Sequence, residues 1–183
     1  MKLPEKYFLY IGNAYPHKNL ERLIEAISSI KYQVSGIKLV LVGHEDFFYK
    51  KLKEKVREMK LERNVIFYEP AKREELTNLY QKALALVFPS LMEGFGLPAV
   101  EAMANNCLVL ASDIPVFREI LDEAVGYFNP QDSKNIAEKL KEVYLNPLPY
   151  DFLKTKAKSL VKKYSWDKLA RETLKAYQEI TNL

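Results

Sequence analysis

The chain of 183 residues suits one domain, and its 48% hydrophobic content is typical of a globular protein. No apolar run approaches the ~20 residues of a membrane-spanning helix, and the basic runs lack the interleaved aromatics of a nucleic-acid-binding protein. The net charge of +4 is modest, and the single cysteine excludes an internal disulfide framework. We expect no signal peptide, because the N-terminal residues lead directly into a strand-like run. We expect a cytoplasmic protein, with a weak peripheral attraction to the inner face of the membrane as the alternative for its lysine-rich helices.

Short runs rich in β-branched or aromatic residues alternate along the chain with longer segments of helical period. Six runs predict strands, in chain order Tyr7–Gly12, Ile37–Gly43, Asn64–Tyr68, Leu84–Phe88, Cys107–Ala111 and Val125–Phe128. Eight segments predict helices, at Leu20–Val34, Asp46–Met59, Glu74–Lys82, Pro98–Ala104, Val116–Leu121, Ser133–Tyr144, Phe152–Lys163 and Trp166–Ile180. Cys107 lies inside an apolar strand run, which indicates a buried structural thiol.

Strands that are almost entirely apolar and alternate with helices predict a parallel sheet covered on both faces. We expect a doubly wound, Rossmann-like α/β fold that forms a single domain over residues 1–183. Such sheets bind ligands beyond the carboxyl ends of their strands, so the residues that follow each strand are the most informative. Gly12, Gly43, Gly94 and Gly96 stand there, although ordinary strand-to-helix turns would explain Gly12 and Gly43 equally well.

The segment after the fourth strand predicts an anion site that also carries two carboxylates. Its glycine-rich loop leads into a helix with Pro98 in the first turn, so free N–H groups and the positive end of the helix dipole face a ligand. Glu93 in the loop and Glu101 in the helix are separated by seven residues. Because carboxylates repel phosphate, we expect these two to accept hydrogen bonds from sugar and ribose hydroxyls on either side of it.

The run Glu93-Gly-Phe-Gly-Leu-Pro-Ala-Val-Glu101, followed by Ala-Met-Ala, resembles the signature of the retaining group 1 glycosyltransferases, which have the two-domain GT-B fold. The resemblance extends through Tyr10-Ile-Gly12, Lys18-Asn-Leu20, Leu41-Val-Gly43, Ala111-Ser-Asp-Ile-Pro115 and Tyr164-Ser-Trp166. It implies the donor-binding C-terminal half of such an enzyme, with a nucleoside diphosphate sugar as co-substrate and a saccharide or lipid-linked acceptor. It implies no cofactor and no metal, and it leaves open whether the sugar is mannose or glucose and whether the nucleotide is UDP, GDP or ADP.

The resemblance implies a catalytic role for Glu93 and Lys18. Glu93 would contact the transferred sugar around its C3 or C4 hydroxyl, and Lys18 would lie against the diphosphate. A cation in that place stabilises the negative charge that the leaving diphosphate gains. Transfer is expected on one face of the sugar, with the leaving phosphate oxygen taking the acceptor's proton, so no nucleophilic side chain is needed.

The rest of the donor site is also implied by the resemblance. Glu101 would bind the ribose hydroxyls. Many relatives carry an arginine near the lysine, and here those positions hold Asn13 and His17, so a protonated His17 is one possible source of the missing charge. The other expected donor contacts are Gly94, Phe95, Gly96, Leu97 and Gly12, with His44 a weaker candidate. The base pocket is expected near Tyr68, Glu69, Pro70 and Ala71, with Leu76 beneath.

A complete member of the family has an N-terminal acceptor domain, in cis or on a partner chain. The helix at 166–180 is expected to pack toward that domain through Leu169, Thr173, Leu174 and Tyr177. The alternative is that these side chains pack on the donor domain itself. Without the other half, we expect weak donor binding and no sugar transfer.

Two other functions stay open. A nucleotide-sugar epimerase of the same general fold shares the donor chemistry but lacks the Gly-Phe-Gly carboxylate pair. A non-catalytic nucleotide-sugar-binding subunit would keep the fold, although the presence of both Glu93 and Glu101 argues against a decayed site. A nicotinamide-binding domain is disfavoured, because Gly12-Asn-Ala-Tyr-Pro-His-Lys18 lacks the Gly-x-Gly-x-x-Gly pattern.

Overall fold

The computed structural model describes residues 3–69 and 73–181 and contains one six-stranded sheet. Its strands are β1 (Phe8–Ile11), β2 (Leu39–Val42), β3 (Val65–Tyr68), β4 (Ala85–Phe88), β5 (Val109–Ser112) and β6 (Gly126–Phe128). Neighbouring strands run parallel in the order β3-β2-β1-β4-β5-β6. This is the order of a doubly wound Rossmann-like sheet. The chain adds strands outward from β1 to β3 on one side, then crosses over and adds β4 to β6 on the other side, so the switch point lies between β1 and β4. The predicted fold class is confirmed.

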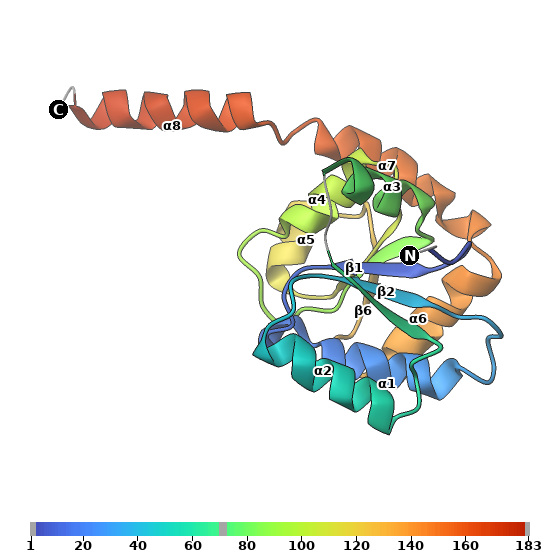
Figure 1. Ribbon diagram of the computed structural model, residues 1–183. Coiled ribbons are helices and arrows are strands. Elements are labelled where there is room, and N and C mark those ends of the chain that lie inside the picture. The colour runs from blue at the N-terminus through green and yellow to red at the C-terminus, as the bar shows by residue number, and fades with distance from the viewer. Residues whose placement is uncertain (1–2, 70–72, 182–183) are drawn as a thin grey trace.

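Helices cover both faces of the sheet (Figure 1). One face carries α1 (Leu20–Ile30), α2 (Phe47–Glu58) and α6 (Ser133–Leu145), and the other carries α3 (Arg73–Lys82), α4 (Leu97–Ala104), α5 (Pro115–Leu121) and α7 (Asp151–Val161). Two short 3-10 helices, η1 (Pro16–Lys18) and η2 (Leu148–Tyr150), and the C-terminal helix α8 (Trp166–Thr181) complete the described chain. Each predicted strand and helix forms, with shifted ends.

The core lies between the sheet and its two helical layers. Every residue of β2, β4 and β5 is buried, as expected for central strands covered on both faces. The apolar stripe of α1 (Leu20, Leu23, Ile24 and Ile27) is buried against the sheet, and each such side chain contributes roughly 1.5–3 kcal/mol. Cys107 is also buried, as predicted, and burial raises the pKa of its thiol to about 12. Its thiol therefore stays protonated at neutral pH and acts as a small core side chain.

Helix α1 ends at Ile30, so the prediction that it continues to Val34 is wrong by one turn. The amide of Gln33 donates to the carbonyl of Ile30 at 2.9 Å, three residues back, which closes a turn. Gly36 follows with φ of 79°, a conformation that glycine adopts without strain. Val34 is nevertheless buried. Because it continues the apolar spacing of the helix, the predicted helix ran too far.

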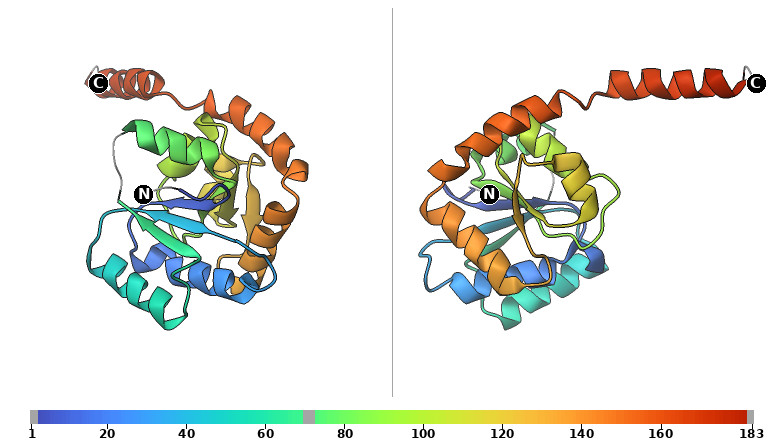
Figure 2. Two further views of the ribbon diagram at one scale, coloured as in Figure 1. Left: turned by 45° about the vertical axis from the view of Figure 1, so that its right-hand side comes forward. Right: turned by 180° about the vertical axis from the view of Figure 1, so that it is seen from behind.

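Helix α8 projects away from the body of the molecule, as all three views show (Figures 1 and 2). Its large apolar side chains are more than half exposed, from 54% for Leu169 to 74% for Trp166. This exposure contradicts the alternative in which they pack on the donor domain. Packing against another domain stays a prediction. Over the described ranges, no helix is both long and apolar enough to cross a membrane.

Candidate functional site

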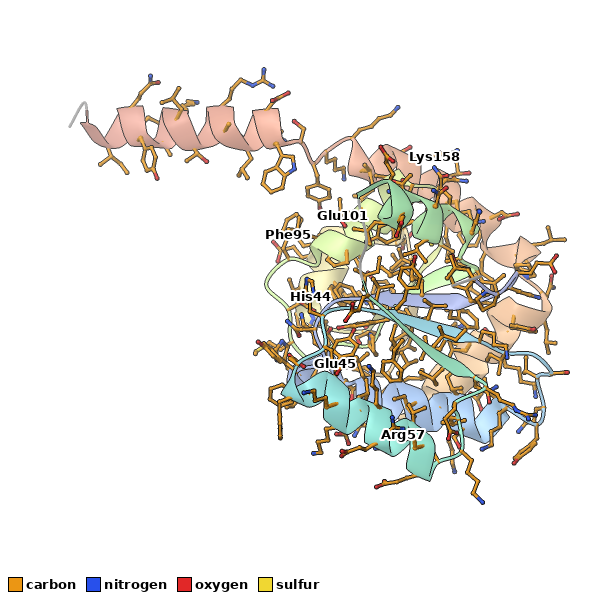
Figure 3. All side chains as sticks on the ribbon, viewed as in Figure 1. His44, Glu45, Arg57, Phe95, Glu101 and Lys158 are labelled. Atoms are coloured by element: carbon orange, nitrogen blue, oxygen red, sulfur yellow. The ribbon has the colours of Figure 1, made fainter. Side chains whose placement is uncertain are left out.

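The loops after β1, β2 and β4 meet at one edge of the sheet, because parallel strands all end on the same side. Figure 3 shows His44, Phe95 and Glu101 along this edge. Arg57 on α2 and Lys158 on α7 lie away from it, in the two helical layers. These two basic residues therefore do not form part of this edge.

The loop after β1 is fixed by hydrogen bonds around Gly12. Gly12 has φ of 151°, and a Cβ added to it would lie 2.8 Å from the Tyr10 hydroxyl, so the position requires glycine. Its amide donates to the Val42 carbonyl at 3.0 Å, and its carbonyl accepts from the Tyr49 hydroxyl at 2.8 Å. The Tyr10 hydroxyl donates to the Asn13 carbonyl at 2.7 Å. The backbone that is expected to contact the donor at Gly12 and Asn13 is therefore preformed.

The two side chains expected to act in catalysis form an ion pair. Lys18 is the last residue of η1, and its Nζ lies 2.6 Å from Oε1 of Glu93 in the loop after β4. The side chains are only 15% and 10% exposed, so solvent screens the pair less than it screens an ion pair on the surface. The fold thus brings together two residues that lie 75 positions apart in the sequence.

Ser90 is a second partner of Glu93. Its fully buried hydroxyl donates to the same Oε1 at 2.8 Å. No described residue donates a hydrogen bond to Oε2 of Glu93, which leaves that oxygen able to accept from a ligand. The sequence prediction did not include Ser90, although its position three residues before Glu93 within a loop was a usable signal.

The η1 segment and the loop after β4 are tied to each other by further hydrogen bonds. Asn19, in the left-handed conformation with φ of 60°, donates from Nδ2 to the carbonyls of Pro89 at 3.0 Å and Pro130 at 2.8 Å. The amide of Leu91 donates to the carbonyl of His17 at 2.8 Å. Asn19 is buried, so these bonds are shielded from water and hold Lys18 and Glu93 in register.

The glycine-rich loop presents backbone amides at the start of α4. No described residue accepts a hydrogen bond from the amides of Gly94, Phe95 or Gly96. Gly96 precedes the helix with φ of 94°, and a Cβ added there would lie 2.9 Å from the ring of Phe117. Leu97, the first helical residue, is exposed. Free amides beside the positive end of a helix dipole form a site suited to an anion.

Phe95 connects this loop to the segment that precedes α8. Its ring packs edge-on against Tyr164, with the ring centroids 5.4 Å apart. The Tyr164 hydroxyl donates to the carbonyl of Ile120 at 2.8 Å, which fixes the ring. The base of α8 is thereby joined to the expected donor loop, a contact that the sequence did not predict.

Glu101 lies on α4 at the same edge (Figure 3), and its side chain accepts a hydrogen bond from a tyrosine. The hydroxyl of Tyr80 on α3 donates to Oε2 of Glu101 at 3.0 Å. Burial, followed by the charge of Glu101, raises the pKa of Tyr80, so the phenol stays protonated and remains a donor. Tyr80 was not predicted as a site residue, and nothing in its sequence spacing indicates this contact.

The expected base pocket is described in part. The hydroxyl of Tyr68, the last residue of β3, donates to Oε2 of Glu75 at 3.2 Å. Leu76 is partly buried against the core, and Glu69 is exposed. Pro70 and Ala71 lie outside the described residues. The assignment of this region to the base stays a prediction.

The remaining polar candidates are placed around the same edge. His17 is partly buried, and its ring centroid lies 6.1 Å from that of Tyr15. Asn13 and His44 are exposed. Among the described residues, no group of three or more His, Cys, Asp and Glu side chains is arranged to hold a metal ion. The donor contacts expected of Asn13 and His17 stay predictions.

A pocket of about 370 Å³ lies beside the site, between the loop after β1 and the first turns of α1 and α2. Three aromatic rings, those of Tyr15, Phe47 and Phe48, line it, with Tyr15 and Phe48 packed edge-on at 5.2 Å. Lys18, Glu93 and Glu101 do not line this pocket. This pocket is therefore distinct from the residues that are expected to bind the donor.

Comparison with known proteins places the chain in a family. Residues 2–160 match the family model of glycosyl transferases group 1. The O-antigen chain mannosyltransferase RfbU of Salmonella typhimurium is 39% identical over 142 residues, which cover 78% of this chain and 39% of that protein. The GDP-mannose:cellobiosyl-diphosphopolyprenol alpha-mannosyltransferase of Komagataeibacter xylinus is 25% identical over 183 residues, covering 98% of this chain and 47% of that protein. The chain thus spans less than half the length of either relative.

A solved structure has the same fold. Sucrose-phosphate synthase from Thermosynechococcus elongatus matches with a TM-score of 0.87 at 27% identity, covering 98% of this chain and 47% of that chain. The Glu-x7-Glu run, the strand order, the site at the edge of the sheet and the family match all agree. This chain belongs to the glycosyl transferases group 1 family.

Proposed function

We propose that this chain is the donor-binding half of a GT-B enzyme that transfers a sugar, with retention, from a nucleoside diphosphate sugar to a saccharide or lipid-linked acceptor. One observation carries the proposal. The Lys18–Glu93 pair lies beside three amides at the start of α4 that have no acceptor among the described residues, and Glu101 follows on the same helix. A carboxylate with a cation, then an anion site, then a second carboxylate would match the sugar, the diphosphate and the ribose of a nucleoside diphosphate sugar.

The diphosphate would lie against the amides of Gly94, Phe95 and Gly96. The N–H groups of these amides have no acceptor among the described residues, so they can donate to phosphate oxygens, and the α4 dipole adds a favourable field for an anion. Lys18 has three N–H donors, so it can hold a phosphate oxygen while it keeps its bond to Glu93. We propose that these groups neutralise the diphosphate without a metal ion.

The two carboxylates would bind the neutral parts of the donor. Oε1 of Glu93 is occupied by Lys18 and Ser90, so Oε2 is the oxygen that would accept from a hydroxyl of the transferred sugar. Glu101 would accept from the ribose hydroxyls. Both carboxylates thus avoid the phosphates, which lie between them at the amides.

In the proposed reaction, the bond between C1 of the sugar and the phosphate oxygen breaks, and the bond from C1 to the acceptor oxygen forms on the same face. The acceptor's proton passes to the leaving phosphate oxygen. Lys18 and the loop amides stabilise the charge that develops on this oxygen, and Glu93 eases the positive charge on the sugar. No side chain needs to become covalently attached.

We propose mannose as the sugar and GDP as the nucleotide. Both curated relatives are named as mannosyltransferases, and the name of the second gives GDP-mannose as its donor. The acceptor site would come from an N-terminal domain, in cis or on a partner chain, and the exposed apolar face of α8 would pack on it.

The test is transfer from GDP-mannose by the enzyme complete with its acceptor domain. Glu93→Gln and Lys18→Ala should each lower kcat by about 10²-fold or more, the range seen when one group that stabilises developing charge is removed. Glu138→Gln, an exposed carboxylate on α6, is the control and should leave kcat unchanged. The anomeric configuration of the product, read by NMR, should match that of the donor.

Unchanged kcat in both site variants would overturn the assigned roles, and an inverted product would overturn retention. Binding of the nucleotide sugar without any transfer would instead favour a non-catalytic binding subunit. Interconversion of the donor into another nucleotide sugar would favour an epimerase.

A further inference from the structure

Tyr80 connects the buried interior of the domain to a carboxylate at its surface. It lies on α3, its side chain is only 2% exposed, and its hydroxyl reaches Oε2 of Glu101 on α4 at 3.0 Å. Among the described residues, this carboxylate oxygen is the only acceptor of the Tyr80 hydroxyl. A buried hydroxyl group strongly requires a partner, so the contact constrains both residues.

The contact restricts a side chain that would otherwise be mobile. Glu101 is exposed, and an exposed glutamate samples several rotamers because three side-chain torsions are free. The Tyr80 ring, in contrast, is held by the core, and α3 is itself anchored by the buried Tyr7 hydroxyl, which donates to the carbonyl of Leu79 at 2.9 Å. The Glu101 carboxylate is therefore restrained by a side chain that the core holds in place.

The contact also leaves the carboxylate able to bind a ligand. Tyr80 donates one proton to Oε2, and no described residue donates to Oε1. A carboxylate offers about four acceptor positions, so enough remain for two ribose hydroxyls. The phenol cannot compete for those hydroxyls as a charged acceptor, because it stays protonated.

We infer that Tyr80 is a positioning residue, which orients Glu101 so that it accepts hydrogen bonds from the ribose hydroxyls of the donor nucleotide. This inference rests on the proposed function of Glu101. Tyr80 itself does not contact the nucleotide. Its removal should therefore affect the recognition of ribose and leave the recognition of the diphosphate intact.

The experiment is calorimetric titration of the chain with GDP and with its 2′,3′-dideoxy analogue. In the unsubstituted chain, GDP should bind more tightly than the analogue. Tyr80→Phe removes only the hydroxyl, and it should weaken GDP binding by about three- to tenfold. This is less than the loss of a direct hydrogen bond between GDP and a charged group, because Tyr80 acts only through the orientation of Glu101. Binding of the dideoxy analogue should not change, so the ratio of the two affinities falls. In a Glu101→Ala background, Tyr80→Phe should have no further effect on GDP binding.

Tyr7→Phe is the matched control, because it removes a buried hydroxyl that anchors the same helix without touching Glu101. Thermal unfolding of each variant shows that it is folded. Equal weakening by Tyr7→Phe, equal weakening toward the dideoxy analogue, or persistence of the effect without Glu101 would each overturn the inference. If Glu101→Ala weakens GDP binding but Tyr80→Phe does not, the inference fails and the proposed function stands. If the unsubstituted chain does not distinguish GDP from the analogue, the role of Glu101 fails and the inference with it.

Discussion

Glu93 is held by two donors that reach the same carboxylate oxygen. Lys18 supplies a charge and Ser90 a buried hydroxyl, at 2.6 and 2.8 Å from Oε1. A carboxylate fixed through one oxygen presents the other in a single direction. Such preorganisation is what a contact with one particular sugar hydroxyl requires, because a loose side chain would have to be ordered on binding.

Ser90→Ala should reduce the free energy of unfolding by about 1.5–3 kcal/mol, because it removes a buried hydrogen bond to a charged acceptor. Ser112→Ala is the control. Ser112 is equally buried, but its hydroxyl donates to the neutral carbonyl of Phe88 at 3.3 Å, so its loss should cost less than about 1 kcal/mol. Urea unfolding measures both. Equal losses in the two variants would mean that the charge of Glu93 does not strengthen the Ser90 bond.

The sequence was informative about site residues where contiguous motifs carry them. Glu93 and Glu101 stand in one run, and Lys18 stands in a short motif after the first strand, so their common edge followed from the fold class. The partners of these residues were missed. Tyr80 meets Glu101 only because α3 and α4 lie side by side, and no local pattern specifies which buried tyrosine reaches which surface carboxylate.

At the scale of elements, the start of α4 depends on one glycine. Gly96 has φ of 94° and lies against the ring of Phe117, whereas a Cβ added to Gly94 would meet nothing within 4 Å. The two glycines of the Gly-Phe-Gly core thus have different reasons to be glycine. Gly96 shapes the turn into the helix, and Gly94 leaves open space where the donor is proposed to bind.

Gly96→Ala should lower the free energy of unfolding by about 1–3 kcal/mol, because a Cβ is strained at this φ and meets the Phe117 ring. In the matched variant, Gly94→Ala, stability should stay within about 0.5 kcal/mol of the unsubstituted chain. Denaturant unfolding of the two variants provides the comparison. A harmless Gly96→Ala would show that the turn into α4 does not need the left-handed conformation.

Element type could be predicted well because the apolar period differs between strands and helices. The strands of the sheet appear as short apolar runs, and α1 appears as a single stripe. The ends of the elements were less predictable. Helix α1 ends at Ile30, but the buried Val34 in the turn that follows continues the helical spacing of apolar residues. Hydrogen bonds and a left-handed glycine set the end, and neither is visible in the period.

At the scale of the whole molecule, two features support the proposal that the chain works with another domain. Its carboxylate pair and free amides lie on a surface edge, and α8 extends from the body with its apolar side chains exposed (Figure 2). The contact of Phe95 with Tyr164 joins these two features, because it connects the donor loop to the base of α8. A domain that binds α8 would therefore lie near the segment that contacts the expected donor loop.

Removal of residues 166–183 should leave the unfolding midpoint of the remaining domain unchanged. Helix α8 has 16 residues and buries little against the body, so in this chain its amides should exchange with solvent nearly as fast as those of an isolated peptide. Hydrogen exchange and thermal unfolding test both statements. Leu160→Ala, in the buried face of α7, is a positive control that should cost about 2–5 kcal/mol. A truncated chain that unfolds at a clearly lower temperature would show that α8 packs on the domain.

The order of the strands is a property of the whole molecule that the sequence did not reveal. Almost every strand is apolar throughout, so the pattern marks them as central without saying which are neighbours. The order becomes fixed only when the crossover helices pack, and it is this order that brings the loops after β1 and β4 together and joins Lys18 to Glu93.

The most direct test of the donor-site assignment is calorimetric titration of this chain with GDP, UDP and ADP, repeated with Glu101→Ala. The account predicts that one nucleotide binds, GDP before the others, and that the substitution weakens its affinity by about tenfold or more, as expected when a charged hydrogen-bond acceptor is lost. Binding that Glu101→Ala leaves unchanged, or no binding of any of the three at millimolar concentration, would contradict the assignment of this edge as the donor site.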